Sequence, residues 1–193
     1  MLLCINGWGV YMNKLKLINI QKCNKRVKKL YKEAFPRNER LPIFILNRLN
    51  KQGTSDFFEI YEKNRFIGML YNVYYKDIVF ILYLAIDNKL RGQGYGSKVL
   101  ELIKDKFNEK RIILNIEQVN KNAFNNEQRL KRKKFYQNNG FKSLNFTVKE
   151  GTEIYEMLCY SKNNSNVDKK EYEILVKNFL GKFLYKVYKK ISE

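Results

Sequence analysis

The chain has 193 residues, of which 45% are hydrophobic and 15% aromatic, so it has enough apolar material to form one domain around a buried core. It carries 38 Lys and Arg residues against 19 acidic ones, a formal net charge of +19, and it has no histidine. The lack of histidine excludes Ser-His-Asp and Cys-His nucleophile arrangements, HExxH metalloproteases and histidine-based zinc sites, because each of these needs an imidazole.

The three cysteines, Cys4, Cys23 and Cys159, are widely spaced and form no CxxC motif. This pattern builds neither a disulfide framework nor a four-cysteine zinc site, so we expect reduced thiols and no metal. No apolar run approaches the roughly 20 residues that a membrane-spanning helix needs. We therefore expect a cytoplasmic protein.

The positive charge raises the possibility of a nucleic-acid partner, since lysine and arginine neutralise phosphates. However, 29 of the basic residues are lysines and only nine are arginines, in a chain that is also rich in asparagine. Lysine and asparagine have AT-rich codons, whereas arginine has GC-rich ones. The excess of lysine over arginine therefore partly reflects the composition of the genome. No basic stretch alternates with aromatic residues as a base-stacking groove would. We do not expect nucleic acid to be the main partner.

The pattern of apolar residues and turn formers predicts an α/β fold with a mixed sheet. Residues 1–12 match no element, and Met12 resembles a second start, so we expect an N-terminal extension outside the core. The predicted strands are Lys14–Ile20, Asp56–Glu62, Phe66–Tyr75, Ile78–Ile86, Arg111–Glu117, Phe141–Lys149 and Glu153–Ser161, and the predicted helices are Cys23–Phe35, Pro42–Lys51, a helix after the glycines of residues 91–96, Glu127–Asn139 and Asp168–Lys190.

The most informative segment follows the apolar run Ile78–Ile86, which is typical of a strand buried on both faces. A glycine-rich turn, Arg91–Gly96, leads from this strand into a helix. Such a turn directs several backbone N–H groups and the positive end of the helix dipole at one point, which suits a phosphate or pyrophosphate. The spacing is wrong for a Walker A loop and one residue short of a dinucleotide-binding GxGxxG motif.

The same turn satisfies the pattern [QR]xxGx[GA], the acyl-CoA pyrophosphate loop of the GNAT superfamily of N-acyltransferases. A second segment, Phe135–Phe141, matches the FYxxxGF motif at the end of the following helix. Ala34–Arg40 is similar to an AFPxxER segment of an uncharacterised bacterial subgroup of these proteins. The two main motifs stand in the right order and at the right separation, so the chain resembles a GNAT acetyltransferase.

The resemblance implies a mostly antiparallel central sheet of six to seven strands flanked by helices. It implies a GNAT domain over residues 13–162, with a linker and an amphipathic helix in residues 163–193. Two central strands, Ile78–Ile86 and Arg111–Glu117, are expected to splay apart and to admit the pantetheine arm of acetyl-CoA, the cosubstrate. The residues expected to bind it are Leu84, Ala85, Ile86, Arg91, Gly92, Gln93, Gly94, Tyr95, Gly96 and Ser97.

Direct transfer to an amine needs a base for the ammonium and an acid for the departing thiolate. The resemblance places Tyr136 as the acid. Glu117 is the carboxylate that the two central strands hold near the splay, and we expect it to be the base. The other carboxylates that could take this role are Glu39, Glu59 and Glu153.

The chain departs from the superfamily at two positions: Arg129 and Arg132 stand where many members have asparagine and alanine. These arginines could meet the cosubstrate's phosphates or the substrate.

The function expected from this resemblance is transfer of an acetyl group from acetyl-CoA to a primary amine of a small molecule or a protein, by a monomer or homodimer. The alternatives are a CoA-binding GNAT module without turnover and a basic nucleic-acid-binding protein. The amphipathic C-terminal helix is expected to dock on its own domain or on a partner subunit, with Gly181 dividing it; the alternative is a membrane surface.

Overall fold

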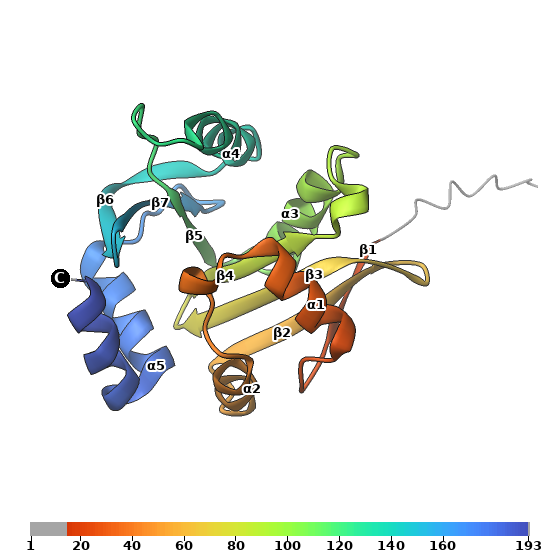
Figure 1. Ribbon diagram of the computed structural model, residues 1–193, viewed down its shortest axis with the longest axis horizontal. Coiled ribbons are helices and arrows are strands. Elements are labelled where there is room, and N and C mark those ends of the chain that lie inside the picture. Colours follow the sequence, from red (N-terminus) through yellow and green to blue (C-terminus); the bar gives the residue numbers. More distant parts are fainter. Residues whose placement is uncertain (1–14, 193) are drawn as a thin grey trace, which may run out of the picture.

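The computed structural model describes residues 15–192 and shows the predicted order of elements (Figure 1). Every strand and helix with predicted bounds lies within two residues of them, and the two 3-10 helices were not predicted; the predicted N-terminal extension, residues 1–12, lies outside the described part. The elements are β1 (Leu15–Asn19), α1 (Lys25–Ala34), a 3-10 helix (Arg37–Glu39), α2 (Ile43–Lys51), β2 (Ser55–Glu62), β3 (Arg65–Tyr75), β4 (Ile78–Ile86), a 3-10 helix (Asn88–Leu90), α3 (Tyr95–Lys106), β5 (Arg111–Glu117), α4 (Asn126–Asn138), β6 (Lys142–Glu150), β7 (Glu153–Tyr160) and α5 (Lys169–Ser192).

The seven strands form one mixed sheet in the order β1-β2-β3-β4-β5-β7-β6, which confirms the predicted fold class. All neighbouring strands are antiparallel except β4 and β5. These two parallel strands pair only over residues 78–80 and 111–113 and then diverge. The sheet is therefore open between β4 and β5 toward their carboxyl ends, as Figure 1 shows.

A β-bulge in β4 changes which side chains face each side of the sheet. Tyr71 of β3 pairs with Tyr83, whereas the next residue, Asn72, pairs with Ile81, so Leu82 is the extra residue. Leu82 and Tyr83 consequently pack into the same core, on one face. Bulges of this kind re-aim side chains next to functional sites.

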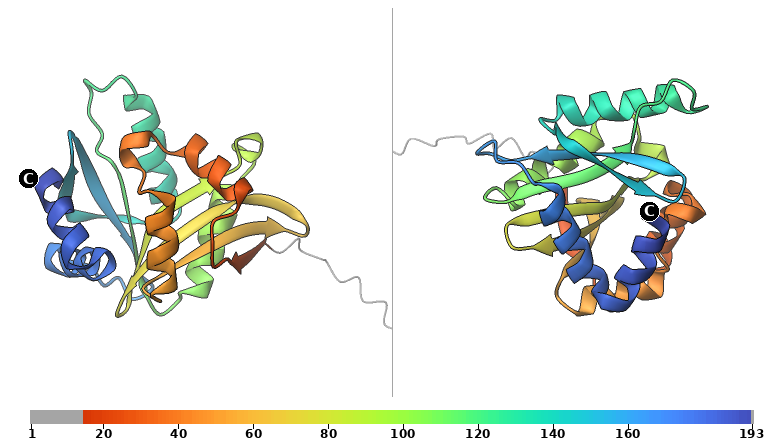
Figure 2. Two further views of the ribbon diagram at one scale, coloured as in Figure 1. Left: turned by 60° about the horizontal axis from the view of Figure 1, so that its bottom comes forward. Right: turned by 90° about the vertical axis from the view of Figure 1, so that its left-hand side faces the viewer.

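Helices cover both faces of the sheet (Figure 2), and a hydrophobic core lies on each face. One core contains buried residues of α1, α2 and α5, and we call this side the α1/α2/α5 face. The other contains buried residues of α3 together with Phe135 and Tyr136 of α4, and we call it the α3/α4 face. The glycine-rich turn and α4 thus lie on the face opposite to the connection between α1 and α2.

The C-terminal helix is divided at Gly181, as predicted, because this residue has a non-helical backbone (φ 71°, ψ 170°). Figure 2 shows the chain turning back at this point. The first half buries Tyr172, Leu175 and Phe179 in the α1/α2/α5 core, so it docks on its own domain. Among residues 15–192, no helix is long and apolar enough to cross a membrane.

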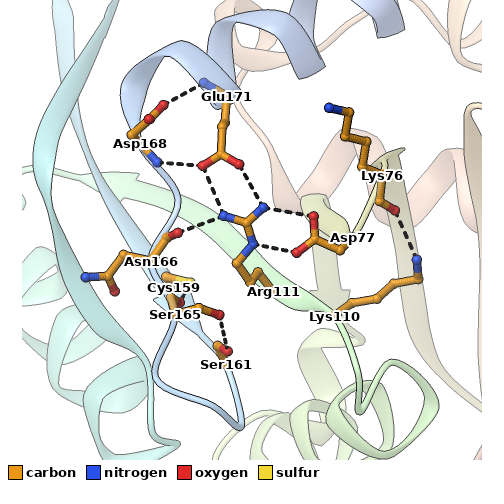
Figure 3. A network of polar contacts seen from close by, with 10 residues as sticks. All are labelled: Lys76, Asp77, Lys110, Arg111, Cys159, Ser161, Ser165, Asn166, Asp168 and Glu171. Atoms are coloured by element: carbon orange, nitrogen blue, oxygen red, sulfur yellow. Dashed lines mark hydrogen bonds and ion pairs between the residues drawn. The ribbon is translucent and has the colours of Figure 1, made fainter.

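A partly buried arginine, Arg111, ties α5 to the point where β4 and β5 still pair (Figure 3). Arg111 donates two hydrogen bonds to Asp77, of 2.6 and 2.8 Å, and two to Glu171, of 2.8 and 3.0 Å. It donates a further bond of 2.7 Å to the carbonyl of Asn166. Since Arg111 pairs with Ile78 in the sheet, this network closes the narrow end of the β4/β5 opening.

Candidate functional site

The glycine-rich turn after β4 forms a cradle of backbone N–H groups at the start of α3. Gly92 and Gly94 have positive φ angles of 75° and 78°, and Gly94 is the residue that caps α3. The N–H groups of the first turn of a helix have no acceptor within the helix, and the helix dipole adds positive potential there. A Cβ atom built on Gly92 or Gly94 would meet no atom within 4 Å, so the space in front of this backbone is open. The turn therefore suits an anion.

Side chains of the turn hold its shape. Arg91 Nε donates to the carbonyl of Ile86 at 3.2 Å, and Gln93 Nε2 donates to the carbonyl of Lys89 at 2.9 Å. The hydroxyl of Tyr95 donates to Glu62 at 2.8 Å, and its ring is buried. These three residues thus offer their backbone, rather than their side chains, to a ligand in the cradle.

The turn lies against α4 through Gly96. A Cβ atom at this position would come within 3.0 Å of the Phe135 ring, so only glycine allows this close approach without displacing the ring. Phe135 precedes Tyr136, the predicted acid. The structure therefore brings the two predicted motifs, the glycine-rich turn and FYxxxGF, side by side.

The predicted segment Leu84–Ile86 lies on the open side of β4. Its residues pair with β3 on one edge, from Gly68 to Leu70, whereas β5 pairs with β4 only as far as Phe80. An unpaired strand edge presents a row of free N–H and C=O groups. This edge leads directly into the cradle, so an extended ligand arm could follow the strand and end in a phosphate group.

Tyr136 lies in α4 and packs on the α3/α4 face against the rings of Phe135 and Phe141, with centroids 5.1 and 5.7 Å away. Within the described residues its hydroxyl makes no hydrogen bond to the protein. Burial raises the pKa of Tyr136, and the charge of Arg132 opposes this effect. The phenol is therefore protonated at neutral pH and free to donate its proton.

Glu117 ends β5 with its carboxylate largely covered and both oxygens engaged. Asn125 Nδ2 donates to Oε1 at 3.0 Å, and Arg129 lies 3.6 Å from the same oxygen. Arg132 forms an ion pair with Oε2. Both oxygens of Glu117 are thus occupied by groups of α4 and of the residue before it. These contacts argue against the predicted role of Glu117 as the base.

Arg129 is buried and serves the protein itself. Its guanidinium donates to Asn125 at 2.7 Å, to the carbonyl of Gln118 at 3.0 Å and to Glu153 at 2.9 Å. The guanidinium also forms an ion pair of 3.6 Å with Glu117. Arg129 therefore binds residues at the end of β5 and at the start of β7. All three nitrogens of this guanidinium thus contact the protein, so the arginine fixes the local geometry.

Two of the remaining predicted carboxylates belong to this region and one does not. Glu39 lies in the 3-10 helix before α2, and its pKa is raised by the charge of Glu117 and lowered by the hydroxyl of Tyr155. Glu153 pairs with Arg129. Glu59 lies on β2, separated from β4 by β3, and accepts a hydrogen bond from Asn24 at 2.8 Å.

Sequence reasoning missed Tyr83 and Tyr155. Tyr83 is the only residue with a hydrogen-bonding side chain in the apolar run of β4, and this exception was an available signal. Tyr155 enters the site because β7 pairs with β5 in a register that places it opposite Glu117. That register depends on tertiary pairing, which no local pattern reports.

Comparison with known proteins agrees with this geometry. Residues 53–143 match the family model of the acetyltransferase (GNAT) domain. No curated protein matches the sequence significantly.

Among solved structures, a protein from Bacteroides thetaiotaomicron assigned to the GNAT family superposes with a TM-score of 0.66, at 21% identity over 83% of this chain and 90% of that one. An acetyltransferase from Bacillus subtilis in complex with CoA gives a TM-score of 0.58, at 12% identity over 77% and 99% of the two chains. The ribosomal-protein-S18-alanine N-acetyltransferase from Escherichia coli gives 0.55, at 14% identity over 80% and 99%. The matched segment runs from the residues before β2 to the start of β6, and it contains the open strand edge, the cradle and both motifs. Residues 53–143 therefore match a GNAT acetyltransferase domain, and the sheet as a whole has the fold of these solved acetyltransferases.

Proposed function

We propose that this protein transfers an acetyl group from acetyl-CoA to a primary amine. The observation that carries the proposal is the continuous path from the unpaired edge of β4 to the cradle at the start of α3. A strand edge that binds an extended arm and a cradle that binds a pyrophosphate are the two features that a CoA thioester requires together.

The residues of the path fit acetyl-CoA. The backbone of Leu84, Ala85 and Ile86 would bind the pantetheine arm, and the N–H groups of residues 91–97 would bind the pyrophosphate. Bound there, acetyl-CoA supplies the thioester whose acyl group is transferred. Within the described residues no group of three or more Cys, Asp or Glu side chains could hold a metal ion, and the proposed chemistry uses none.

Tyr136 is the proton donor in this proposal. Proton transfer from a phenol of pKa near 10 to a thiolate whose thiol has a pKa near 8.5 is unfavourable by itself. The transfer therefore requires that the phenol lie directly beside the departing sulfur. Tyr136 lies on the α3/α4 face, next to the cradle, and its hydroxyl has no protein partner within the described residues. Both features suit a donor that acts on the cosubstrate side of the sheet.

The acceptor in this proposal is a primary amine, and related folds suggest which amines to test. Solved structures with the same fold include enzymes named for spermidine, for the alanine of ribosomal protein S18 and for the 6′-amine of aminoglycosides. We therefore define a panel of three probes: spermidine, a peptide with N-terminal alanine, and kanamycin.

The test is release of free CoA thiol from acetyl-CoA with each amine of this panel. We expect release that depends on at least one amine and calorimetric binding of CoA. Binding of CoA without release would instead show a CoA-binding module that lacks turnover. Absence of CoA binding would overturn the proposal altogether.

A further inference from the structure

A short turn that carries a carboxylate is fastened to the face of β4. The hydroxyl of Tyr83 donates to the carbonyl of Glu39 at 2.9 Å and accepts from the N–H of Leu41 at 3.0 Å. One hydroxyl therefore holds the backbone on both sides of Arg40. The 3-10 helix that ends at Glu39 thus has a fixed position relative to the sheet.

Tyr83 is itself rigidly placed. It is buried, and its ring packs edge-on against Tyr31 and Phe35, each with a centroid distance of 4.9 Å. The bulge at Leu82 turns Tyr83 toward the α1/α2/α5 face, directly before Leu84, where the unpaired edge of β4 is expected to bind pantetheine. Glu39 is consequently anchored on the face opposite to the cradle, at the level of the opening.

Strand alternation places Glu117 on the same face as Glu39. Ile112, Leu114 and Ile116 of β5 pack in the α3/α4 core, so Glu117 belongs to the alternate set of side chains. Tyr155 of β7 lies opposite Glu117 in the sheet, and it and Glu39 influence each other's pKa. The three side chains therefore meet where the sheet is open.

Glu39 differs from its acidic neighbours in its partners. Glu117 and Glu153 each form ion pairs with arginines, whereas Glu39, among the described residues, makes no ion pair within 4 Å. Burial raises the pKa of Glu39, and the charge of Glu117 raises it further, while Tyr155 and Arg132 oppose the shift. Glu39 is thus the carboxylate of this group that, among the described residues, no arginine holds in an ion pair.

We propose that Glu39 is the base that deprotonates the acceptor amine, with Tyr83 as its positioning residue. This inference rests on the proposed function. It replaces the sequence-based assignment of Glu117, which instead forms an ion pair with Arg132.

The reaction moves two protons, one on each face of the sheet: Glu39 handles the proton of the ammonium group, and Tyr136 handles the proton of the departing thiol. Glu39 takes one proton from the ammonium group, directly or through a water, and later releases it to solvent. The neutral amine attacks the thioester carbonyl, so the C–N bond forms as the C–S bond breaks. Tyr136 gives its proton to the departing sulfur and recovers the surplus proton from the positively charged nitrogen that has attacked, which leaves the neutral amide.

The test compares Glu39→Gln with Glu33→Gln across a pH series, using the acceptor of the panel that gives the fastest CoA release. Glu33 is the matched control because it is an exposed glutamate of α1, the helix that precedes the turn with Glu39. Its only ion pair among the described residues is a weak one with Lys29, at 3.9 Å. We expect Glu39→Gln to lower kcat about 100-fold at pH 7, within the usual range for a general base. With an aliphatic amine of pKa near 10.4 the deficit should shrink at least tenfold by about pH 9.5, because the neutral fraction of the amine then rises; with the α-amine of the peptide, whose pKa is near 8, it should already shrink by about pH 8.5.

The dependence of kcat on pH reflects Glu39 together with the charged and titratable groups that face it from neighbouring elements. These are Tyr83 of β4, Glu117 of β5, Arg132 of α4, Glu150 of β6, and Glu153 and Tyr155 of β7. For this reason Tyr83→Phe is measured as a second variant. We expect it to lower kcat about tenfold, with KM for acetyl-CoA unchanged, because the turn loses its anchor while the cradle is untouched.

Equal activity of Glu39→Gln and Glu33→Gln in an active protein would overturn this assignment and leave the proposed function standing. A loss of activity in Glu39→Gln that stays constant from pH 7 to about 9.5 would also overturn it, because a purely structural defect does not depend on the protonation of the amine. Absence of CoA release by the wild-type protein with every amine of the panel would overturn the proposed function and, with it, this assignment.

Discussion

Gly68 of β3 lies directly against the backbone of Ala85 in β4: a Cβ atom at Gly68 would come within 2.1 Å of the Ala85 carbonyl oxygen. Ala85 belongs to the strand segment whose other edge is open toward β5. The absence of a side chain at Gly68 therefore fixes how closely β3 supports the edge that is proposed to bind pantetheine.

Gly68→Ala is expected to destabilise the protein by about 1–3 kcal/mol, because the added methyl group meets main-chain atoms that cannot rotate away. It should also weaken CoA binding, since β4 must shift. Urea unfolding and calorimetry measure the two effects. Gly96→Ala is the matched control for overpacking: its methyl group would meet the movable Phe135 ring at 3.0 Å, so its cost in stability should be smaller. Equal costs for both variants would contradict this explanation.

Gly94→Glu is expected to abolish CoA binding, because it places a negative side chain in the cradle that is proposed to bind the pyrophosphate. Gly53→Glu is the control. Gly53 has nearly the same backbone angle, with a φ of 75° against 78°, and a Cβ atom there also meets nothing within 4 Å. Gly53 follows α2 and is not part of the cradle. Gly53→Glu therefore introduces the same backbone strain as Gly94→Glu but places no charge where the ligand is proposed to bind. Calorimetry showing normal CoA affinity for Gly94→Glu would remove the turn from the site.

The fold was predictable because each element has a local signature. The apolar run Ile78–Ile86 predicted a buried strand with its observed bounds, Gly140 and Gly181 marked helix ends, and the turn Arg91–Gly96 marked the start of α3. Periodicity and turn chemistry are properties of neighbouring residues, so a single sequence reports them well.

The partners of the charged residues were not predictable in the same way. Glu117 was expected to be a free carboxylate, but α4 brings Arg129 and Arg132 to it across a loop. Glu39 and Tyr155 meet only because the α1–α2 connection, β5 and β7 converge at the open end of the sheet. These contacts depend on strand order and register, which act between distant parts of the chain.

Tyr136→Phe is expected to lower kcat at least tenfold while CoA binding stays nearly the same. The substitution removes only the hydroxyl, which makes no hydrogen bond within the described residues, and keeps the ring packed against Phe135 and Phe141. Steady-state kinetics and calorimetry separate turnover from binding. The control is Tyr160→Phe, whose ring contacts Phe141 at the far end of the same cluster. Unchanged turnover in Tyr136→Phe would reject the role of acid.

The Asp77–Arg111–Glu171 network is expected to make stability depend on pH. Hydrogen bonds from Arg111 lower the pKa of Asp77 and of Glu171 below their usual values. A carboxyl group whose pKa is lowered by folding contributes stability above the pKa it has in the unfolded chain, and this contribution is lost as the pH falls through the lowered value.

Arg111→Gln should therefore lower the melting temperature at pH 7, and the difference from wild type should narrow as the pH falls below about 4, where free carboxyl groups become protonated. The control is Lys29→Gln, which removes an exposed pair of 3.9 Å and should leave the melting temperature nearly unchanged at both pH values. Thermal melts followed by circular dichroism give the comparison. A difference between Arg111→Gln and wild type that is the same at pH 7 and pH 3 would show that the network stabilises α5 by packing of the arginine side chain rather than by its ion pairs.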